Sequence, residues 1–193
     1  MDNHIYVWDN YVYLLPIVLV ILILLVYFVK TSNRLNRYRV IITESKKNVD
    51  IALTKRYDTI SEMLKVAKSF ARHEKITFSD LVQLRAGVSI NEFNKVIANQ
   101  EQALGRIYAL AEAYPQLRSS EEFVNLQNQI DDENEQLAAA KRIVNNNISV
   151  FNQDVVTFPV SIIASMKGLQ QIDFLAEEHV DTKGDIDHFD YEV

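Results

Sequence analysis

One stretch near the N-terminus constrains this chain more than any other feature. Asn10–Val29 contains no charged residue, and from Leu14 onward it is almost purely aliphatic. A helix of this length rises about 30 Å, which is the thickness of the hydrocarbon core of a bilayer. Aromatic residues flank both ends, as at membrane interfaces. A cleaved signal peptide would need a basic segment before the run and small residues after it, and neither is present. The sequence therefore predicts one transmembrane helix over residues 11–30.

The charges that flank this run predict which side of the membrane the rest of the chain occupies. No Lys or Arg precedes the run, whereas a juxtamembrane basic group follows it: Lys30, Arg34, Arg37 and Arg39. Positive flanks remain in the cytoplasm, so we expect residues 1–10 outside and the C-terminal domain inside. The same bases could bind anionic lipid headgroups, although setting the topology is the favoured interpretation.

Composition narrows the fold and the function. Only 4 Gly, 3 Pro and no Cys occur in 193 residues, which favours few, long helices and excludes disulfides, thiolate metal sites and a Cys nucleophile. The net charge of -6 is concentrated in residues 177–193, which we expect to be a disordered acidic tail, because residues 31–176 are nearly neutral. No basic stripe for a phosphate backbone is present, so nucleic-acid binding is not expected.

Apolar residues recur every three or four positions in three segments of residues 31–176, the pattern of amphipathic helices. The first begins at Leu35 and ends near residue 73. The second is expected to begin at a Thr77 cap and to end at Pro115. The third follows a cap at Ser119 or Ser120 and ends at Pro159. Each would span about 38–40 residues, or about 57–60 Å, and a shorter fourth helix is expected over about 160–176.

Equal lengths and short connections predict an all-α fold, namely an N-terminal transmembrane helix followed by an elongated antiparallel bundle of three long helices and a shorter fourth. In that arrangement the 114–120 corner returns to the membrane. The 73–77 and 157–160 corners would then lie together about 60 Å away. Nothing between Lys30 and Leu35 breaks a helix, so the anchor and the first helix can form one continuous rod.

Several short motifs, in order and with suitable spacing, carry a family resemblance. They are Lys55-Arg56-Tyr57-Asp58, Ala71-Arg72-His73-Glu74, Leu110-Ala111-Glu112-Ala113-Tyr114-Pro115, Phe123-Val124-Asn125-Leu126-Gln127, and Phe158-Pro159 followed by Ile162-Ile163-Ala164. Over roughly residues 10–178 the chain resembles the LemA family of bacterial, membrane-anchored helical bundles. It departs from that pattern at Val144-Asn145, where an aromatic-Asn pair is usual, although Phe151-Asn152 is retained, and at Gly168-Leu169. The resemblance implies the inner membrane and association with a membrane protease or an envelope-stress component.

His73 and Glu74 form the pair that looks most reactive. A zinc site would need further ligands nearby, but the residue one turn before His73 is Ser69. A His at a helix C-terminus, bonded to the last carbonyls, is the favoured alternative. Neither a metal nor a cofactor is expected.

Arg56, Tyr57 and Asp58 can be read either as a ligand clamp or as an ion-paired step inside the bundle. Arg56 and Asp58 lie on different helix faces, so each would have its partner on another helix, and structural pairing is favoured. Glu112 and Tyr114 are expected to cap the turn and pack it against Pro115.

Polar residues also interrupt the apolar rhythm at one common height: Ser45 and Asn48, Gln100, and Asn134. They could form a buried layer whose members hydrogen-bond one another, because unpaired buried amides cost about 1–3 kcal/mol each. Alternatively, Asn48 and Asn134 could simply face solvent.

The sequence favours a non-enzymatic interaction or scaffold protein of the cell envelope that docks a protein partner through its bundle. The expected docking residues are those of the far corner: His73, Glu74, Phe158 and Pro159. The alternatives are a membrane-bound hydrolase or metal-dependent enzyme using His73 and Glu74 and, less favoured, a lipid-surface module using the juxtamembrane bases.

Overall fold

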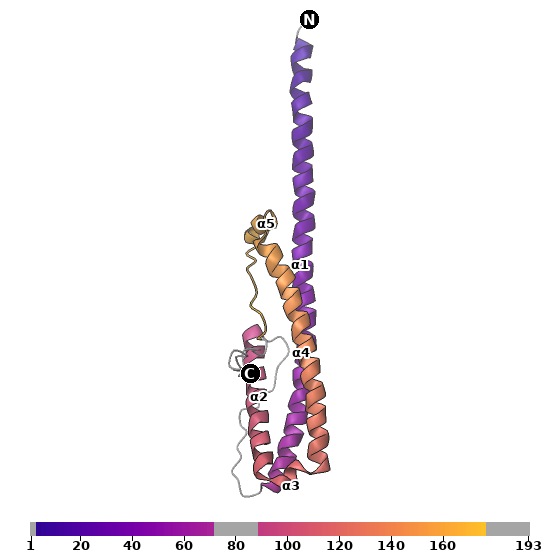
Figure 1. Cartoon of the computed structure of the whole chain (residues 1–193). Coiled ribbons are helices and arrows are strands. Elements are labelled where there is room, and N and C mark those ends of the chain that lie inside the picture. The colour runs from indigo at the N-terminus through magenta and orange to yellow at the C-terminus, as the bar shows by residue number, and fades with distance from the viewer. Residues whose placement is uncertain (1–2, 72–88, 177–193) are drawn as a thin grey trace, which may run out of the picture. The chain divides into compact units, whose positions relative to one another are not determined.

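The computed structural model describes residues 3–71 and 89–176, with side chains from Leu14 onward, and every regular element among them is helical (Figure 1). The expected all-α class is confirmed. The tail at 177–193 and the segment at 72–88 lie outside the described residues. The helices are α1 (Asn3–Phe70), α2 (Ile90–Ala113), α3 (Pro115–Arg118), α4 (Glu121–Val156) and α5 (Val160–Met166).

Helix α1 continues without a break from the apolar run into the first soluble helix. Neither Gly nor Pro occurs from Lys30 to Phe70, so no residue in that stretch removes a backbone hydrogen bond or favours a bend. The most apolar part of α1 has a mean hydropathy of 2.7, and only 6% of it is buried. α1 is therefore long and apolar enough to span a membrane, and the expected single N-terminal apolar helix is present.

The chain divides into two compact units, each with an apolar core. Unit 1 comprises Met1–Lys47 and Ile143–Asp173, and unit 2 comprises Asn48–Arg142 and Phe174–Val193. The core of unit 1 takes one stripe of α1, the end of α4 and one face of α5. Its buried side chains are Leu35, Ile42, Val144, Ile148, Phe151, Val155, Val160, Ile163 and Ala164.

In unit 1 the segment that follows α4 folds back and is held by side-chain bonds. Asn152 binds the backbone of Ile172 twice, because its Nδ2 donates to the Ile172 carbonyl and its Oδ1 accepts from the Ile172 N–H, both at 2.8 Å. Lys167 Nζ donates to Ser32 Oγ at 2.7 Å and to Asn36 Oδ1 at 3.0 Å. α5 thereby lies beside the part of α1 that follows the apolar run (Figure 1).

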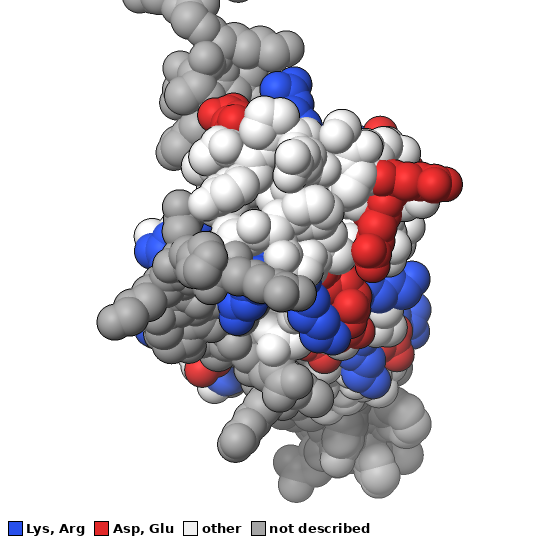
Figure 2. Space-filling model, turned by 90° about the horizontal axis from the view of Figure 1, so that it is seen from below, with Lys and Arg blue, Asp and Glu red and all other residues white. Residues whose placement is uncertain are grey.

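In unit 2 the end of α1 packs with α2, α3 and the start of α4. The apolar cluster contains Ile60, Met63, Leu64, Val66, Ala67 and Ala71 of α1, Ala103, Leu104, Ile107, Leu110 and Ala111 of α2, Leu117 of α3, and Phe123 and Ile130 of α4. Seen from below, uncharged residues occupy the centre of this face, and acidic and basic residues lie around it (Figure 2).

The expected antiparallel pairing of the first two soluble helices is wrong. Gln100 binds Leu53, and the later residues of α2 pack with the later residues of α1, so these two helices run parallel. α4 runs antiparallel to α1, because Thr59 binds Glu133 while Phe123 packs in the cluster that contains Ala71. Parallel neighbours require a long connection, and the residues between Ala71 and Ser89, including the expected 73–77 corner, lie outside the described residues.

The second helix is also shorter than expected, with 24 residues instead of about 38–40. Ser89 has extended backbone angles (φ -71°, ψ 163°) and closes a capping box with Glu92, so the helix begins at Ile90. Thr77, the expected cap, lies outside the described residues. At α4 the Ser120 hydroxyl accepts from the Phe123 N–H at 3.4 Å, which identifies Ser120 as the cap of that helix.

Each of two corners packs near a part of α1 other than the one expected. The 114–120 corner does not pack beside the anchor, because Leu117 belongs to the cluster at the end of α1. The 157–160 corner precedes α5, which binds Ser32 through Lys167 immediately after the anchor. The cause is the parallel α2, which returns the chain to the end of α1 before α4 begins.

The fourth helix covers only Val160–Met166 and not 160–176. Gly168 adopts φ 64°, and the N–H of Leu169 donates to the Ala164 carbonyl at 2.9 Å. This is the Schellman arrangement, in which a glycine in the left-handed region ends a helix.

We predict that the Ser89→Ala substitution destabilises the full chain by about 1 kcal/mol, because α2 loses its cap. Chemical denaturation in detergent, followed by circular dichroism, measures the effect. Ser119→Ala is the matched control, because the exposed Ser119 hydroxyl reaches only the Gln116 carbonyl. Equal midpoints for the two variants would contradict the assignment of the cap.

The same box predicts a pH dependence. Hydrogen bonds from the Ser89 N–H and hydroxyl lower the pKa of the exposed Glu92 carboxyl below its ordinary 4.5. A lowered folded-state pKa stabilises the fold above the ordinary value, and this stabilisation is lost as pH falls through the lowered pKa. The Glu92→Gln variant should therefore unfold earlier than the parent at neutral pH. The gap between their midpoints should shrink in acid, and a gap that stays constant with pH would contradict this role.

Candidate functional site

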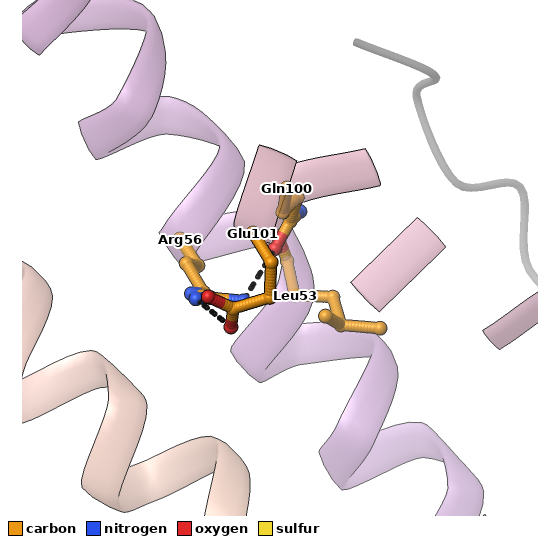
Figure 3. Close-up of polar contacts among 4 residues, drawn as sticks. All are labelled: Leu53, Arg56, Gln100 and Glu101. Carbon is orange, nitrogen blue, oxygen red and sulfur yellow. Dashed lines mark hydrogen bonds and ion pairs between the residues drawn. The ribbon is translucent and has the colours of Figure 1, made fainter. Parts of the chain in front are cut away.

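A buried arginine links α1 to α2 in unit 2. Arg56 is 1% exposed and occupies a core position between Leu53 and Ile60. Its guanidinium lies 2.5 Å from Glu101 Oε1 and 3.5 Å from Gln100 Oε1 (Figure 3). Gln100 is 2% exposed, and its Nε2 donates to the Leu53 carbonyl at 2.9 Å. The arginine, the amide and the carboxylate thus fix one register between the two helices.

One turn further along α1, a second polar group links α1 to α4. Thr59 Oγ1 donates to Glu133 Oε1 at 2.8 Å, and Gln129 Nε2 donates to both Thr59 Oγ1 at 2.8 Å and Glu133 Oε1 at 3.1 Å. Glu133 is buried, and its second oxygen, Oε2, has no hydrogen-bond partner among the described residues. We call the two groups together the polar band: Arg56, Thr59, Gln100, Glu101, Gln129 and Glu133.

Burial and nearby charges shift the pKa of a neighbouring tyrosine, Tyr108. Partial burial raises the pKa of the Tyr108 hydroxyl, the negative charges of Asp131 and Glu101 raise it further, and Arg56 opposes them. A raised pKa keeps this phenol protonated at neutral pH, so it can donate a hydrogen bond but is not a general base there.

An open depression of about 410 Å³ lies over the second half of the polar band, between α1 and α4. Its lining residues are Lys55, Asp58, Thr59, Gln129, Asp132, Glu133 and Gln136. The lining carries three acidic residues and one basic residue, so its formal charge is negative. Glu133 is one of the lining residues, and carboxylate oxygens accept hydrogen bonds, so the depression suits a positively charged donor group.

The structure separates the three candidate residues that follow Lys55. Arg56 points into the core, Tyr57 is partly buried, and Asp58 is exposed at the depression. Among the described residues the ion pair of Arg56 is with α2, and none of the ion pairs involves Asp58. The expected partner on another helix is thus found for Arg56, whereas for Asp58 none occurs among the described residues.

At the next corner Tyr114 forms the C-cap of α2, where its N–H donates to the Leu110 carbonyl at 3.0 Å, and its side chain packs against the apolar cluster. Pro115 begins α3, and its side chain and that of Glu112 are exposed.

The expected docking residues are only partly described. His73 and Glu74 lie outside the described residues, so their proposed role stays a prediction. Phe158 and Pro159 are both exposed just before α5, and Phe158 has 77% of its surface accessible. No group of three or more His, Cys, Asp or Glu side chains suited to a metal ion occurs in residues 3–71 and 89–176.

The juxtamembrane bases are all exposed. Arg34 forms an ion pair with Asp154 of α4, with 3.0 Å between Nε and Oδ2. Arg39 lines an open depression made entirely of α1 residues, together with Asn36, Val40, Thr43, Glu44 and Lys47. Arg34 thus has a structural partner, whereas Lys30 and Arg37 remain accessible to ligands or lipid.

The expected polar layer has the wrong members. Gln100 is buried as that layer required, but it binds α1 and no bond to Asn134 is present. Ser45 bonds the Ile42 carbonyl within its own helix, and Asn48 is exposed. The height estimate failed because it assumed that α2 runs antiparallel to α1.

Sequence reasoning missed residues for which a signal existed. Glu133 stands at a core position of the apolar rhythm, four residues before Leu137. Arg56 was expected to pair inside the bundle, but the sequence did not identify Glu101 as its partner. Ser89 and Glu92 have the capping-box spacing. Lys167 and Gln129 carried no such signal, because their partners lie on other helices.

We predict that Glu101→Ala destabilises the full chain by about 1–3 kcal/mol, because it leaves the buried Arg56 without its counter-charge. Because Glu101 is half-exposed, the expected loss of stability is smaller than the loss on breaking a fully buried ion pair. The double variant Arg56→Met/Glu101→Ala should recover part of that loss, since no charge is then left unpaired. Denaturant midpoints of the three proteins test this, and a double variant less stable than Glu101→Ala would refute it.

Comparison with known proteins adds one match to this geometry. A model described as the LemA family matches residues 45–187, about three quarters of the chain. No curated protein matched the chain. The match includes the polar band, the α2–α3–α4 corner and α5. The chain therefore belongs to the LemA family.

Proposed function

We propose that this protein is a membrane-anchored, non-enzymatic interaction protein of the bacterial cell envelope, and that it binds a protein partner through its helical bundle. The observation that carries the proposal is the depression between α1 and α4. Its lining includes Lys55, Asp58, Asp132 and Glu133, and one buried carboxylate oxygen of Glu133 has no hydrogen-bond partner among the described residues. An unsatisfied buried acceptor costs about 1–3 kcal/mol, which a donor from a partner would recover.

The chemistry of the depression selects the kind of partner. Three acidic side chains against one basic side chain favour a segment that presents Lys or Arg, because opposite charges steer association and fix orientation. The depression is open and lies along two helices, which suits a helix or an extended segment better than a small molecule. A membrane protease or an envelope-stress component that bears such a segment is the partner class consistent with the family.

The enzymatic alternative depends on His73 and Glu74. Both lie outside the described residues, so no observed geometry favours a hydrolase. The other polar groups of the band bond mainly to one another, which supports a role in fixing the register of the bundle. A buried ion pair that specifies one arrangement is a known use of such groups.

We predict that the partner binds in the depression and can be crosslinked to residues that line it. A benzophenone amino acid at Gln136 should crosslink a specific protein in intact membranes, whereas the same group at Glu135, an exposed neighbour outside the lining, should not. The double variant Asp58→Lys/Asp132→Lys should abolish the product from position 136. Equal products from both positions, or a product that survives the charge reversal, would eliminate the depression as the docking surface.

The proposed orientation has its own test. With the basic group after the apolar run, the domain should face the cytoplasm. Alkaline phosphatase fused after Val193 should be inactive, because that enzyme folds only when exported, and a fluorescent protein fused there should be active. An active phosphatase fusion would place the domain outside.

A further inference from the structure

The exposed face of α5 in unit 1 is apolar. Phe158, just before the helix, Ile162 and Met166 have 77%, 53% and 72% of their surfaces accessible. Ile162 and Met166 are four residues apart and share one face. The opposite face, with Ile163 and Ala164, is buried in the core of unit 1. α5 therefore exposes a row of large apolar side chains. Their exposure to water is unfavourable in free energy.

Two contacts place this row next to the anchor. Lys167 binds Ser32, which follows Val29, the last residue of the apolar run, by about 4.5 Å of helical rise. Arg34 forms its ion pair with Asp154, near the end of α4. α5 thus lies at the level where α1 leaves the hydrocarbon, within the polar layer that adds about 5–7 Å to each side of a bilayer.

The orientation of α5 is equally specific. α4 packs along α1 in unit 1, and α5 is bent by 95° from α4. A helix that turns away at this angle beside a membrane-spanning helix lies close to the membrane plane. With seven residues it rises only about 10 Å, too short to cross a bilayer, but the length suits a helix lying at the surface.

The charge of the segment is compatible with a lipid surface. Residues 155–172 contain no Asp or Glu and a single charge, Lys167. Lys30 and Arg37, exposed on the neighbouring part of α1, add positive charge at the same level. A short apolar segment without acidic residues of its own and with accessible basic neighbours has the composition of an interfacial helix.

From this arrangement we propose that α5 is a second membrane contact, whose Phe158, Ile162 and Met166 side chains insert into the headgroup–acyl boundary of the bilayer that α1 crosses. The inference rests on the proposed membrane anchoring. Because Lys167 ties α5 to α1, the contact would hold unit 1 against the membrane surface, so that the bundle is supported at two points.

The absence of Cys permits a direct test by single-cysteine labelling of the full chain. Three variants, Met166→Cys, Leu22→Cys and Asn146→Cys, are labelled with the fluorophore NBD and reconstituted into phosphatidylethanolamine–phosphatidylglycerol vesicles. Leu22 reports on the anchor. Asn146, exposed on α4 about 15 Å before its end, reports on water next to unit 1. Lipids carrying a spin label near the headgroup or near the acyl-chain end quench the fluorophore by depth.

The expected result is blue-shifted NBD emission at position 166, quenched several-fold more by the shallow than by the deep spin label and several-fold more than at position 146. Ile162→Asp, at an exposed position, should reverse both effects without changing the circular dichroism spectrum. Quenching at 22 with water-like emission at 166 would overturn the interfacial contact and leave the anchor intact. Blue-shifted emission at 166 without lipid quenching would overturn it in favour of a protein occupant. Absence of quenching at position 22 would contradict the proposed membrane anchoring and, with it, the inference that rests on it.

Discussion

A guanidinium buried in the core must find its charge partner, and this requirement organises unit 2. Arg56 contacts Glu101 and Gln100 of α2, and Gln100 bonds the Leu53 carbonyl, so these positions of α2 lie beside α1. The apolar cluster that follows joins later residues of both helices, so α2 runs parallel to α1. That orientation excludes a tight turn between the two helices and demands a long connection. It also brings the start of α4 to the end of α1, so α4 runs back antiparallel and pairs with Thr59. Apolar packing alone would tolerate several registers, whereas a buried ion pair penalises all but one.

The two halves of the polar band therefore differ in how completely their polar groups are hydrogen-bonded. Toward α2 the groups bond one another in the core, which accounts for their burial without any ligand. Toward α4 the bonding among the described residues is incomplete, because one oxygen of Glu133 has no partner there and Glu133 lines an acidic, open depression. Lys55 and Asp58, which flank the structural Arg56, line that depression. A four-residue motif can thus serve the fold with one residue and a partner with its neighbours, because successive residues of a helix face different directions.

In unit 1, side-chain hydrogen bonds hold the segment that follows α4. Asn152 binds the backbone of Ile172 with both ends of its amide, and Lys167 binds α1 with its ammonium group. These bonds explain why the chain folds back after α4 although α5 is very short. In the proposed membrane contact, the exposed apolar residues of α5 would lie against lipid and not against water. An anchored bundle with a second surface contact would be restricted in the directions from which a partner can reach it.

The sequence alone determined the features that depend on neighbours along the chain. The uncharged run, the helical periodicity and the uninterrupted α1 follow from local composition, and the ends of α4 follow from the positions of Ser120 and Pro159. Residues matched to the family, such as Phe151-Asn152, were visible as motifs, but the role of Asn152 was not, because its partner is 20 residues away.

Only the tertiary structure decided the direction of α2, the height of each corner, the early end of α5 and the true members of the polar band. Periodicity reports which face of a helix is apolar and is the same for parallel and antiparallel neighbours. The choice between them depends on pairs such as Arg56 with Glu101, whose energy exists only when residues distant in the sequence meet in a low-dielectric core.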